Sequence, residues 1–143
     1  MDKLAFLPQK YKFKILILED SPNRQEAFLE RFSGSLFAVT ICEHAQECIS
    51  LLKKDEYEVV FLDHDLNGKF IDFDKYDCGT VVAEWINKNP ISAQIVIHSL
   101  NIKAVRNMQR LLPDSMHLPL IWEEDNFKKR MKLFGLRGNY SDI

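Results

Sequence analysis

Acidic residues, histidines and small polar residues follow three apolar segments of the chain at the point where each segment ends. These groups are Glu19 and Asp20, then Asp63, His64 and Asp65, and finally His98 and Ser99, with Asn101 two residues further on. Carboxylates that gather at one place repel one another unless a cation lies among them, and an oxygen-rich cluster favours a hard ion such as Mg²⁺. If the three segments end at one edge of the fold, we therefore expect a magnesium or manganese site there.

Each of these residues also has a simpler interpretation. A single acid at the end of a strand more often caps a helix or faces water, and His64 and His98 are both compatible with positions in the core. The coincidence of three segment ends favours a shared site over these separate explanations.

Apolar segments alternate with amphipathic segments along the chain, which is typical of strands that alternate with helices. We expect strands at residues 13–18, 36–41, 58–63 and 93–99, and a weaker one at 117–122 because Pro119 cannot donate a ladder hydrogen bond. Ser21 and Pro22 suit the start of the first helix. The expected helical faces, at the spacing of an amphipathic helix, contain Ala27, Phe28 and Phe32; Ala45, Cys48, Ile49 and Leu52; Val82, Trp85 and Ile86; Val105, Met108 and Leu112; and Phe127, Met131 and Phe134.

This alternation predicts an α/β fold with a doubly wound sheet of five parallel strands, since parallel strands need right-handed crossover helices. Functional sites in such sheets lie beyond the carboxyl ends of the strands. With a strand order of 2-1-3-4-5, the first, third and fourth strands are neighbours. The polar groups that end these strands would then converge.

The length of 143 residues and the hydrophobic share of 46% indicate one domain. We place this domain at residues 13–134, between an N-terminal extension at 1–12 and a C-terminal tail at 135–143. The net charge of −2 lacks the basic surface that binds long nucleic acid. The apolar stretch at residues 4–7 is too short for a signal peptide or a membrane span, so we expect a cytoplasmic protein without a membrane partner.

Three cysteines, Cys42, Cys48 and Cys78, match no zinc or disulfide spacing. We expect them to fill the core as small apolar residues.

The motifs ILILED, VVFLDHDL and IVIHS together resemble the receiver domain of two-component signalling over residues 13–134. This resemblance implies a flavodoxin-like, three-layer sandwich. It also implies that Glu19, Asp20 and Asp63 hold Mg²⁺, that Asp63 accepts a phosphoryl group, and that Ser99 contacts a phosphoryl oxygen. Receivers typically end their fifth strand in a Lys-Pro pair, whereas this chain has Leu118 and Pro119 there.

Other motifs resemble a receiver offshoot, the cyclic-phosphate processing receiver domain. They are LDHDL, the run GTVVAEWI at residues 79–86, and IHSLN before Asn107 and Met108. This second resemblance implies action on cyclic phosphates.

Opening a cyclic phosphate requires a positive centre on the non-bridging oxygens, a base for water and an acid for the leaving alkoxide. A metal on Asp20 and Asp63, with Glu19 as a further ligand, would supply the positive centre. The catalytic candidates are His64 and His98, since imidazole titrates near neutrality, with Asp65 either orienting His64 or joining the metal. Ser99, Asn101 and Arg24 are the candidates for binding phosphate oxygens. Arg24 has an alternative as a solvated surface charge, as do Lys103 and Arg106.

Residues 66–77 form a connection longer than the two to six residues that are usual between a strand and a helix. Long loops beside a site commonly act as lids. Phe70, Phe73 and Tyr76 would then stack on a base or ring, or else the loop packs on its own aromatic residues.

Three functions remain open. The first is a metal-dependent phosphoesterase that acts on a small cyclic-phosphate ligand, either a cyclic nucleotide or the cyclic-phosphate end of a nucleic acid. The second is a stand-alone response-regulator receiver that a sensor kinase phosphorylates on Asp63. The third is a receiver-derived binding module without chemistry. The absent lysine and the added histidines favour the first.

Overall fold

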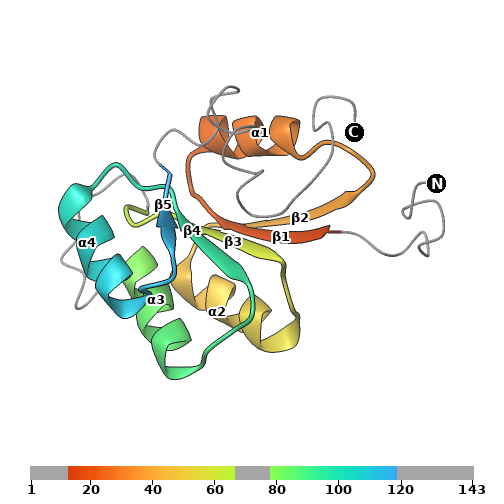
Figure 1. The fold of residues 1–143 in the computed structure, drawn as a ribbon. Helices are drawn as coiled ribbons and strands as arrows, with labels where there is room; N and C mark the ends of the chain where they lie inside the picture. The colour runs from red at the N-terminus through yellow and green to blue at the C-terminus, as the bar shows by residue number, and fades with distance from the viewer. Residues whose placement is uncertain (1–12, 67–77, 119–143) are drawn as a thin grey trace.

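The computed structural model describes residues 13–66 and 78–118, in which five strands alternate with four helices (Figure 1). The strands are β1 (Phe13–Leu18), β2 (Phe37–Cys42), β3 (Val59–Leu62), β4 (Gln94–Ile97) and β5 (Met116–His117). The helices are α1 (Pro22–Arg31), α2 (Ala45–Lys54), α3 (Gly79–Lys88) and α4 (Ile102–Leu111).

The strands form one parallel sheet in the order β2-β1-β3-β4-β5, which confirms the predicted fold class and strand order. Helix α1 covers one face of the sheet, and α2, α3 and α4 cover the other (Figure 1). The described residues therefore form the predicted three-layer sandwich. The connections from β1 to α1, from β2 to α2 and from β4 to α4 leave the carboxyl ends of their strands, which a parallel sheet places at one edge.

The boundaries of β1, β2, β3 and β4 agree with the sequence expectations to within two residues, whereas β5 ends at His117, before the predicted end at residue 122. Strand β1 begins and ends as predicted, and β5 begins at Met116, one residue early. Several predicted features lie outside the described residues, so the structure does not test them. They are the helix with Phe127, Met131 and Phe134, the loop aromatics Phe70, Phe73 and Tyr76, the extension 1–12 and the tail 135–143.

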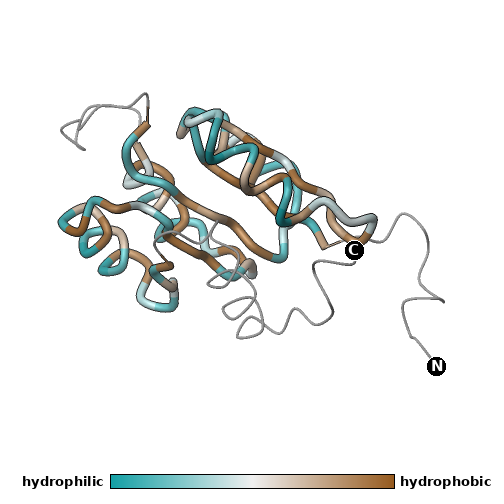
Figure 2. The backbone as a smooth tube through the Cα atoms, turned by 90° about the horizontal axis from the view of Figure 1, so that it is seen from above, coloured by the Kyte–Doolittle hydropathy of each residue, from teal (hydrophilic) through white to brown (hydrophobic). Residues whose placement is uncertain are grey.

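Side chains alternate between the two faces of the sheet, as the pleat of a strand requires. Ile15 and Ile17 of β1 pack in the core layer under α1, whereas Leu16 and Leu18 pack in the layer under α2, α3 and α4. The strands are coloured hydrophobic along most of their length (Figure 2), which fits a sheet covered on both faces. This two-residue alternation also determines which polar side chains meet where the strands end.

The cysteines are buried, as expected from their spacing. Cys42 and Cys48 belong to the core layer under α2, α3 and α4, while Cys78 lies at the N-cap of α3.

Helix α1 begins as its sequence predicts. Ser21 is the N-cap, its Oγ accepts a hydrogen bond from the backbone N–H of Arg24, and Pro22 occupies the first turn. Each of the four described helices has ten residues. None of the described helices is long and apolar enough to cross a membrane.

Candidate functional site

Glu19, Asp63, His98 and Leu118 lie level with one another at the carboxyl edge of the sheet. Each follows a residue that is paired in the ladder, and the backbone hydrogen bonds continue past the strand ends. The N–H of Asp63 donates to Leu18 O (3.2 Å), that of His98 to Leu62 O (3.0 Å) and that of Leu118 to Ile97 O (2.9 Å). Because the pleat alternates, we expect these four side chains to turn toward the α1 face.

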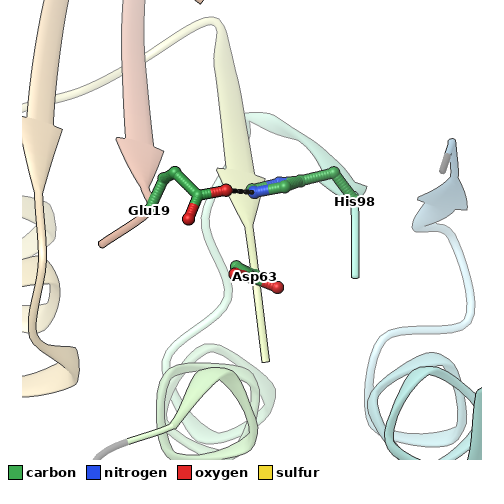
Figure 3. Close-up of side chains that lie close together, drawn as sticks. All are labelled: Glu19, Asp63 and His98. Carbon is green, nitrogen blue, oxygen red and sulfur yellow. Dashed lines mark hydrogen bonds and ion pairs between the residues drawn. The ribbon is translucent and has the colours of Figure 1, made fainter. Parts of the chain in front are cut away.

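Three of these side chains meet in one buried cluster. Glu19 Oε1 lies 3.1 Å from His98 Nε2, and one ligand atom from each of Glu19, Asp63 and His98 lies within 4.8 Å of the others. Figure 3 shows the Glu19 carboxylate and the His98 ring directed at each other across the end of β3, with Asp63 beside them. Their exposed fractions are 0%, 4% and 1%, so bulk water solvates none of them well.

Arg24 of α1 also reaches this cluster. Its Nε and Nη2 donate to Glu19 Oε1 and Oε2 at 2.7 and 3.2 Å, and Nη2 lies 3.5 Å from Asp63 Oδ2. The guanidinium therefore donates two hydrogen bonds to the Glu19 carboxylate and lies close to that of Asp63. Arg24, for which the sequence left open a phosphate-binding role and a solvated surface charge, therefore lies at the cluster with its side chain 36% exposed. Lys103 and Arg106, the other basic candidates, are exposed on α4.

The two buried carboxyl groups differ in their electrostatics. Burial opposes ionisation of Glu19, but hydrogen bonds from His98 and Arg24 outweigh it and hold the pKa of Glu19 at about 2. Burial raises the pKa of Asp63 to about 6; the charges of His98 and Arg24 oppose this rise, and that of Glu19 adds to it. Glu19 is thus a permanent anion in the cluster, while Asp63 exchanges a proton near neutral pH.

The His98 ring is fixed in place by aromatic contacts on the α1 side of the sheet. Its centroid lies 5.1 Å from that of Phe28 in an edge-to-face arrangement, and 6.4 Å from that of Phe61. Because Glu19 is ionised and only accepts hydrogen bonds, His98 Nε2 is the donor in their contact. This packing aims Nε2 into the cluster.

A second polar group contains His64, which follows Asp63 and takes different partners. His64 Nδ1 lies 2.7 Å from Asp65 Oδ1, and that same carboxylate oxygen accepts from Asn101 Nδ2 at 3.3 Å. Burial opposes protonation of His64, yet hydrogen bonds with the Cys78 and Asp65 side chains raise its pKa above the usual range. Asp65 therefore lies beside His64, and its role in orienting that ring stays a prediction.

The contact between His64 and Cys78 was not expected from the sequence, which indicated only a core-filling role for this thiol. An antiparallel bridge joins Asp65 to Cys78, and the N–H of Gly79 donates to His64 O at 3.1 Å. A side chain at Gly79 is excluded, since its Cβ would lie 2.0 Å from the backbone oxygen of Asp63. The pair Cys78-Gly79 directly before a helical run was the available signal for this close approach.

Ser99 and Asn101 shape the loop between β4 and α4. Ser99 Oγ accepts from the N–H of Asn101 at 3.0 Å, and Asn101 Oδ1 caps α4 by accepting from the N–H of Ala104 at 3.2 Å. His117 Nε2 donates to Ser99 O at 2.9 Å, a contact that sequence reasoning missed. The position of His117 at the start of the apolar segment 117–122 was its only signal.

Asp20, which the sequence predicts as a metal ligand together with Glu19, follows Glu19 beyond the end of β1 and is half-buried. Its negative charge raises the pKa of Arg24, after the larger effect of Glu19. Among the described residues, the group that could hold an ion combines Glu19 and Asp63 with His98.

The model of one family, the cyclic-phosphate processing receiver domain, matches residues 14–114. The chain belongs to this family. That match covers well over half of the 143 residues and includes all three members of the buried cluster. No curated protein matches the chain.

Solved structures similar to this receiver domain share its fold at low sequence identity. The receiver domain of a putative LuxO repressor protein from Vibrio parahaemolyticus has a TM-score of 0.64 at 20% identity, over 86% of this chain and 89% of its own. The response regulator TrrA from Thermotoga maritima, solved with Mg²⁺ and beryllium fluoride, has a TM-score of 0.66 at 20% identity, over 85% and 97%. The receiver domain of an HD domain-containing protein from Pseudomonas fluorescens has a TM-score of 0.69 at 13% identity, over 92% and 91%.

The position where receivers typically place a lysine holds an apolar residue in this receiver domain. Leu118 precedes Pro119, is 5% exposed and lies beside His98 in the row of strand ends. It belongs to the core layer under α1, together with Phe28 and Phe61. The cluster instead receives the cationic side chain of Arg24, which comes from α1 and contacts Glu19 and Asp63.

Proposed function

We propose that this receiver domain is a metal-dependent phosphoesterase that opens a cyclic phosphate, in a cyclic nucleotide or at the end of a nucleic acid. The observation that carries the proposal is the meeting of Glu19, Asp63 and His98, whose ligand atoms lie within 4.8 Å of one another. The name of the family points to the same class of substrate.

The donor set suits a divalent cation. Two carboxylates with almost no exposure leave negative charge that only nearby cations can balance, and Arg24 supplies one such charge. A divalent ion held by Glu19 and Asp63 would supply the positive centre for the non-bridging oxygens of the phosphate. Burial raises the pKa of Asp63, which means that its ionised form is poorly stabilised in the metal-free cluster. A bound cation would stabilise that ionised form.

His64 is the acid–base group in this proposal. The Asp65 carboxylate holds its Nδ1 at 2.7 Å, which leaves Nε2, a buried atom, as the one that would exchange a proton with the leaving alkoxide when the substrate binds. The raised pKa of His64 keeps a proton available near neutral pH. His98 was the second acid–base candidate, but its place beside Glu19 and Asp63 favours a role in binding the ion.

Phosphate binding is assigned to Arg24, Ser99 and Asn101. Arg24 already lies at the cluster, and it replaces the receiver lysine as the side chain that neutralises charge. Asn101 shares the carboxylate of Asp65 with His64, so a phosphate near Asn101 would also be near the proposed acid.

A second candidate is a response-regulator receiver that a sensor kinase phosphorylates on Asp63. The fold of the neighbours favours it, and one of them, TrrA, was solved with Mg²⁺ and beryllium fluoride. One feature of this chain opposes it: the apolar Leu118 at the position where receivers typically place a lysine. A receiver-derived binding module without chemistry is the third candidate.

The three candidates are separated by one set of incubations of the full chain with Mg²⁺, Mn²⁺ or Zn²⁺. The substrates are a panel of 3′,5′- and 2′,3′-cyclic nucleotides and oligonucleotides with cyclic ends, beside acetyl phosphate as a phosphoryl donor. Turnover that is lost in His64→Ala but kept in His117→Gln supports the phosphoesterase. An acid-labile adduct that is lost in Asp63→Asn, without turnover, supports the phosphorylated receiver instead. If neither turnover nor an adduct is observed, the binding module without chemistry is the remaining candidate.

A further inference from the structure

The ligand set of the buried cluster contains an imidazole nitrogen. His98, and not Ser99, lies level with Asp63 at the sheet edge, and His98 Nε2 faces Glu19 Oε1 at 3.1 Å. A serine or threonine at this level would offer oxygen and leave an all-oxygen site. The exchange of one donor atom changes which ions the site prefers, because imidazole suits transition ions and carboxylate or water suits Mg²⁺.

The donors are close enough to share one small ion, although the shortest distance among them is also that of the hydrogen bond between Glu19 and His98. Two ligands of a tetrahedral ion lie about 3.3 Å apart when each bond is about 2.0 Å long. Glu19 Oε1 and His98 Nε2 are already at 3.1 Å, and an oxygen of Asp63 lies within 4.8 Å of both. A modest inward movement of Asp63 would complete a three-ligand set with one position open, as in catalytic zinc sites.

The burial of the cluster also disfavours Mg²⁺. Mg²⁺ loses its water shell reluctantly and usually keeps several waters when it binds a protein. The three donors are 0%, 4% and 1% exposed, and the His98 ring is held by Phe28 and Phe61. A site enclosed in this way has little room for retained waters. It favours an ion that binds side chains directly.

We propose that His98 is a metal ligand and that the Glu19–Asp63–His98 cluster prefers a transition ion of the Zn²⁺ type to Mg²⁺. This inference rests on the proposed function, since it assigns the ion of that same site. It also revises the magnesium or manganese expected from the sequence, where the acids alone were considered as ligands. His98 binds through Nε2 and carries its proton on Nδ1 when the ion replaces the hydrogen bond to Glu19.

The test compares metal affinities of the full chain and its variants by calorimetry on metal-free protein. Zn²⁺ binds most protein sites more tightly than Mg²⁺, so the informative quantity is the ratio of the two affinities. We expect His98→Ser to lower the Zn²⁺/Mg²⁺ ratio by at least about tenfold, the effect typical of losing one metal-orienting or ligating group. His117→Gln removes a histidine that lies outside the cluster and should leave the ratio unchanged.

Two further measurements keep the result interpretable. His98→Asn retains a polar group of similar size, so a ratio that falls in both variants is not a consequence of misfolding in one; circular dichroism of each metal-free variant checks the fold. The absorption spectrum of the Co²⁺-loaded protein reports its ligands, and it should show four-coordination without the thiolate charge-transfer band that binding to Cys42, Cys48 or Cys78 would produce.

The two negative results of these measurements have different consequences. An unchanged ratio in both His98 variants, or a thiolate band, overturns the assignment of His98 while a metal-dependent phosphoesterase stands. The absence of binding by any divalent ion overturns both the ligand assignment and the proposed function.

Discussion

Glu19 Oε1 and His98 Nε2 lie 3.1 Å apart, although 79 residues separate them in the chain. Three levels of structure produce this contact. The parallel register sets both residues at the same height, the pleat turns both toward α1, and Phe28 fixes the imidazole ring. Asp63 follows β3, the strand between theirs, so three segments that are distant in the chain bring their polar side chains together.

Removal of the Glu19 charge should weaken both the cluster and the fold. In Glu19→Gln we expect divalent-ion affinity to fall by at least about tenfold, because an amide is a poorer ligand than a carboxylate. The pKa of Glu19 is lowered from 4.5 to about 2, so its contribution to stability is present above pH 4.5 and is lost as the pH falls toward 2. Urea unfolding of wild type should therefore lose stability over this range, while that of Glu19→Gln should change less. Glu43→Gln, at an exposed acid beside the same strand ends, should behave as wild type.

Arg24 and a bound ion should compete to neutralise the same carboxylates. Loss of the guanidinium in Arg24→Ala should destabilise the metal-free protein by roughly 1–3 kcal/mol, less than a fully buried pair because the Arg24 side chain is 36% exposed. The same variant should gain affinity for a divalent ion, since a repelling charge has been removed. Thermal unfolding with and without Zn²⁺ would measure both effects. An ion that stabilises wild type more than Arg24→Ala would contradict this competition.

Metal binding should weaken in mild acid because protons compete for Asp63. Its pKa is raised from 3.8 to about 6, so affinity should fall about tenfold between pH 7 and pH 5 through this group alone. The stability of the metal-free protein has the opposite dependence: the protonated Asp63 favours the fold at low pH, and this contribution is lost as the pH rises through about 6. Calorimetric titrations at several pH values test the first statement. A flat affinity over this range would show that Asp63 is not a ligand.

Asp65 should control the protonation of His64. The Asp65→Asn change removes the negative charge that the His64 ring contacts at 2.7 Å, so the pKa of His64 should fall. Nuclear magnetic resonance titration of the His64 ring measures this directly. In the matched variant Asp114→Asn, which changes an exposed acid before β5, the His64 titration should not move.

Gly79 should not tolerate even a methyl group. Glycine to alanine at a helix position usually stabilises a protein by about 0.4–1 kcal/mol, if the backbone permits it. Here the added Cβ would lie 2.0 Å from Asp63 O, so Gly79→Ala should destabilise by about 1–3 kcal/mol and disturb the position of Asp63. The sign of the change in urea unfolding is the test. A stabilised Gly79→Ala would mean that α3 and the end of β3 are less closely packed than the structure shows.

The fold and part of the site followed from sequence patterns that depend on local geometry. The alternation of apolar and amphipathic segments predicted the strands and the parallel sheet, and the order 2-1-3-4-5 was assumed from the fold class. The rule that sites lie beyond strand ends selected a set of residues that includes Glu19, Asp63 and His98. The sequence did not show which polar side chains at the strand ends turn toward the α1 face of the sheet and which turn toward the opposite face. A two-residue alternation decides whether His98 or Ser99 turns toward the α1 face, but it becomes informative only when the exact end of each strand is known, and strand ends were uncertain by one or two residues.

Contacts made by long side chains were also beyond the sequence patterns. Arg24 has a helical position and a flexible chain, and only the folded distance between α1 and β3 shows that it reaches two carboxylates. The Cys78 and His64 pair depends on the close approach at Gly79, which no hydrophobic periodicity reports.

The central claim is that Glu19, Asp63 and His98 bind one divalent ion together. Anomalous X-ray diffraction from crystals of the full chain grown with Zn²⁺, recorded on both sides of the zinc absorption edge, tests it most directly. The account predicts one strong peak per chain within bonding distance of Glu19 Oε1, an Asp63 carboxylate oxygen and His98 Nε2, with the Arg24 guanidinium moved away from Glu19. A cluster that still holds the Arg24–Glu19 pair, with zinc bound only elsewhere on the chain, would contradict it.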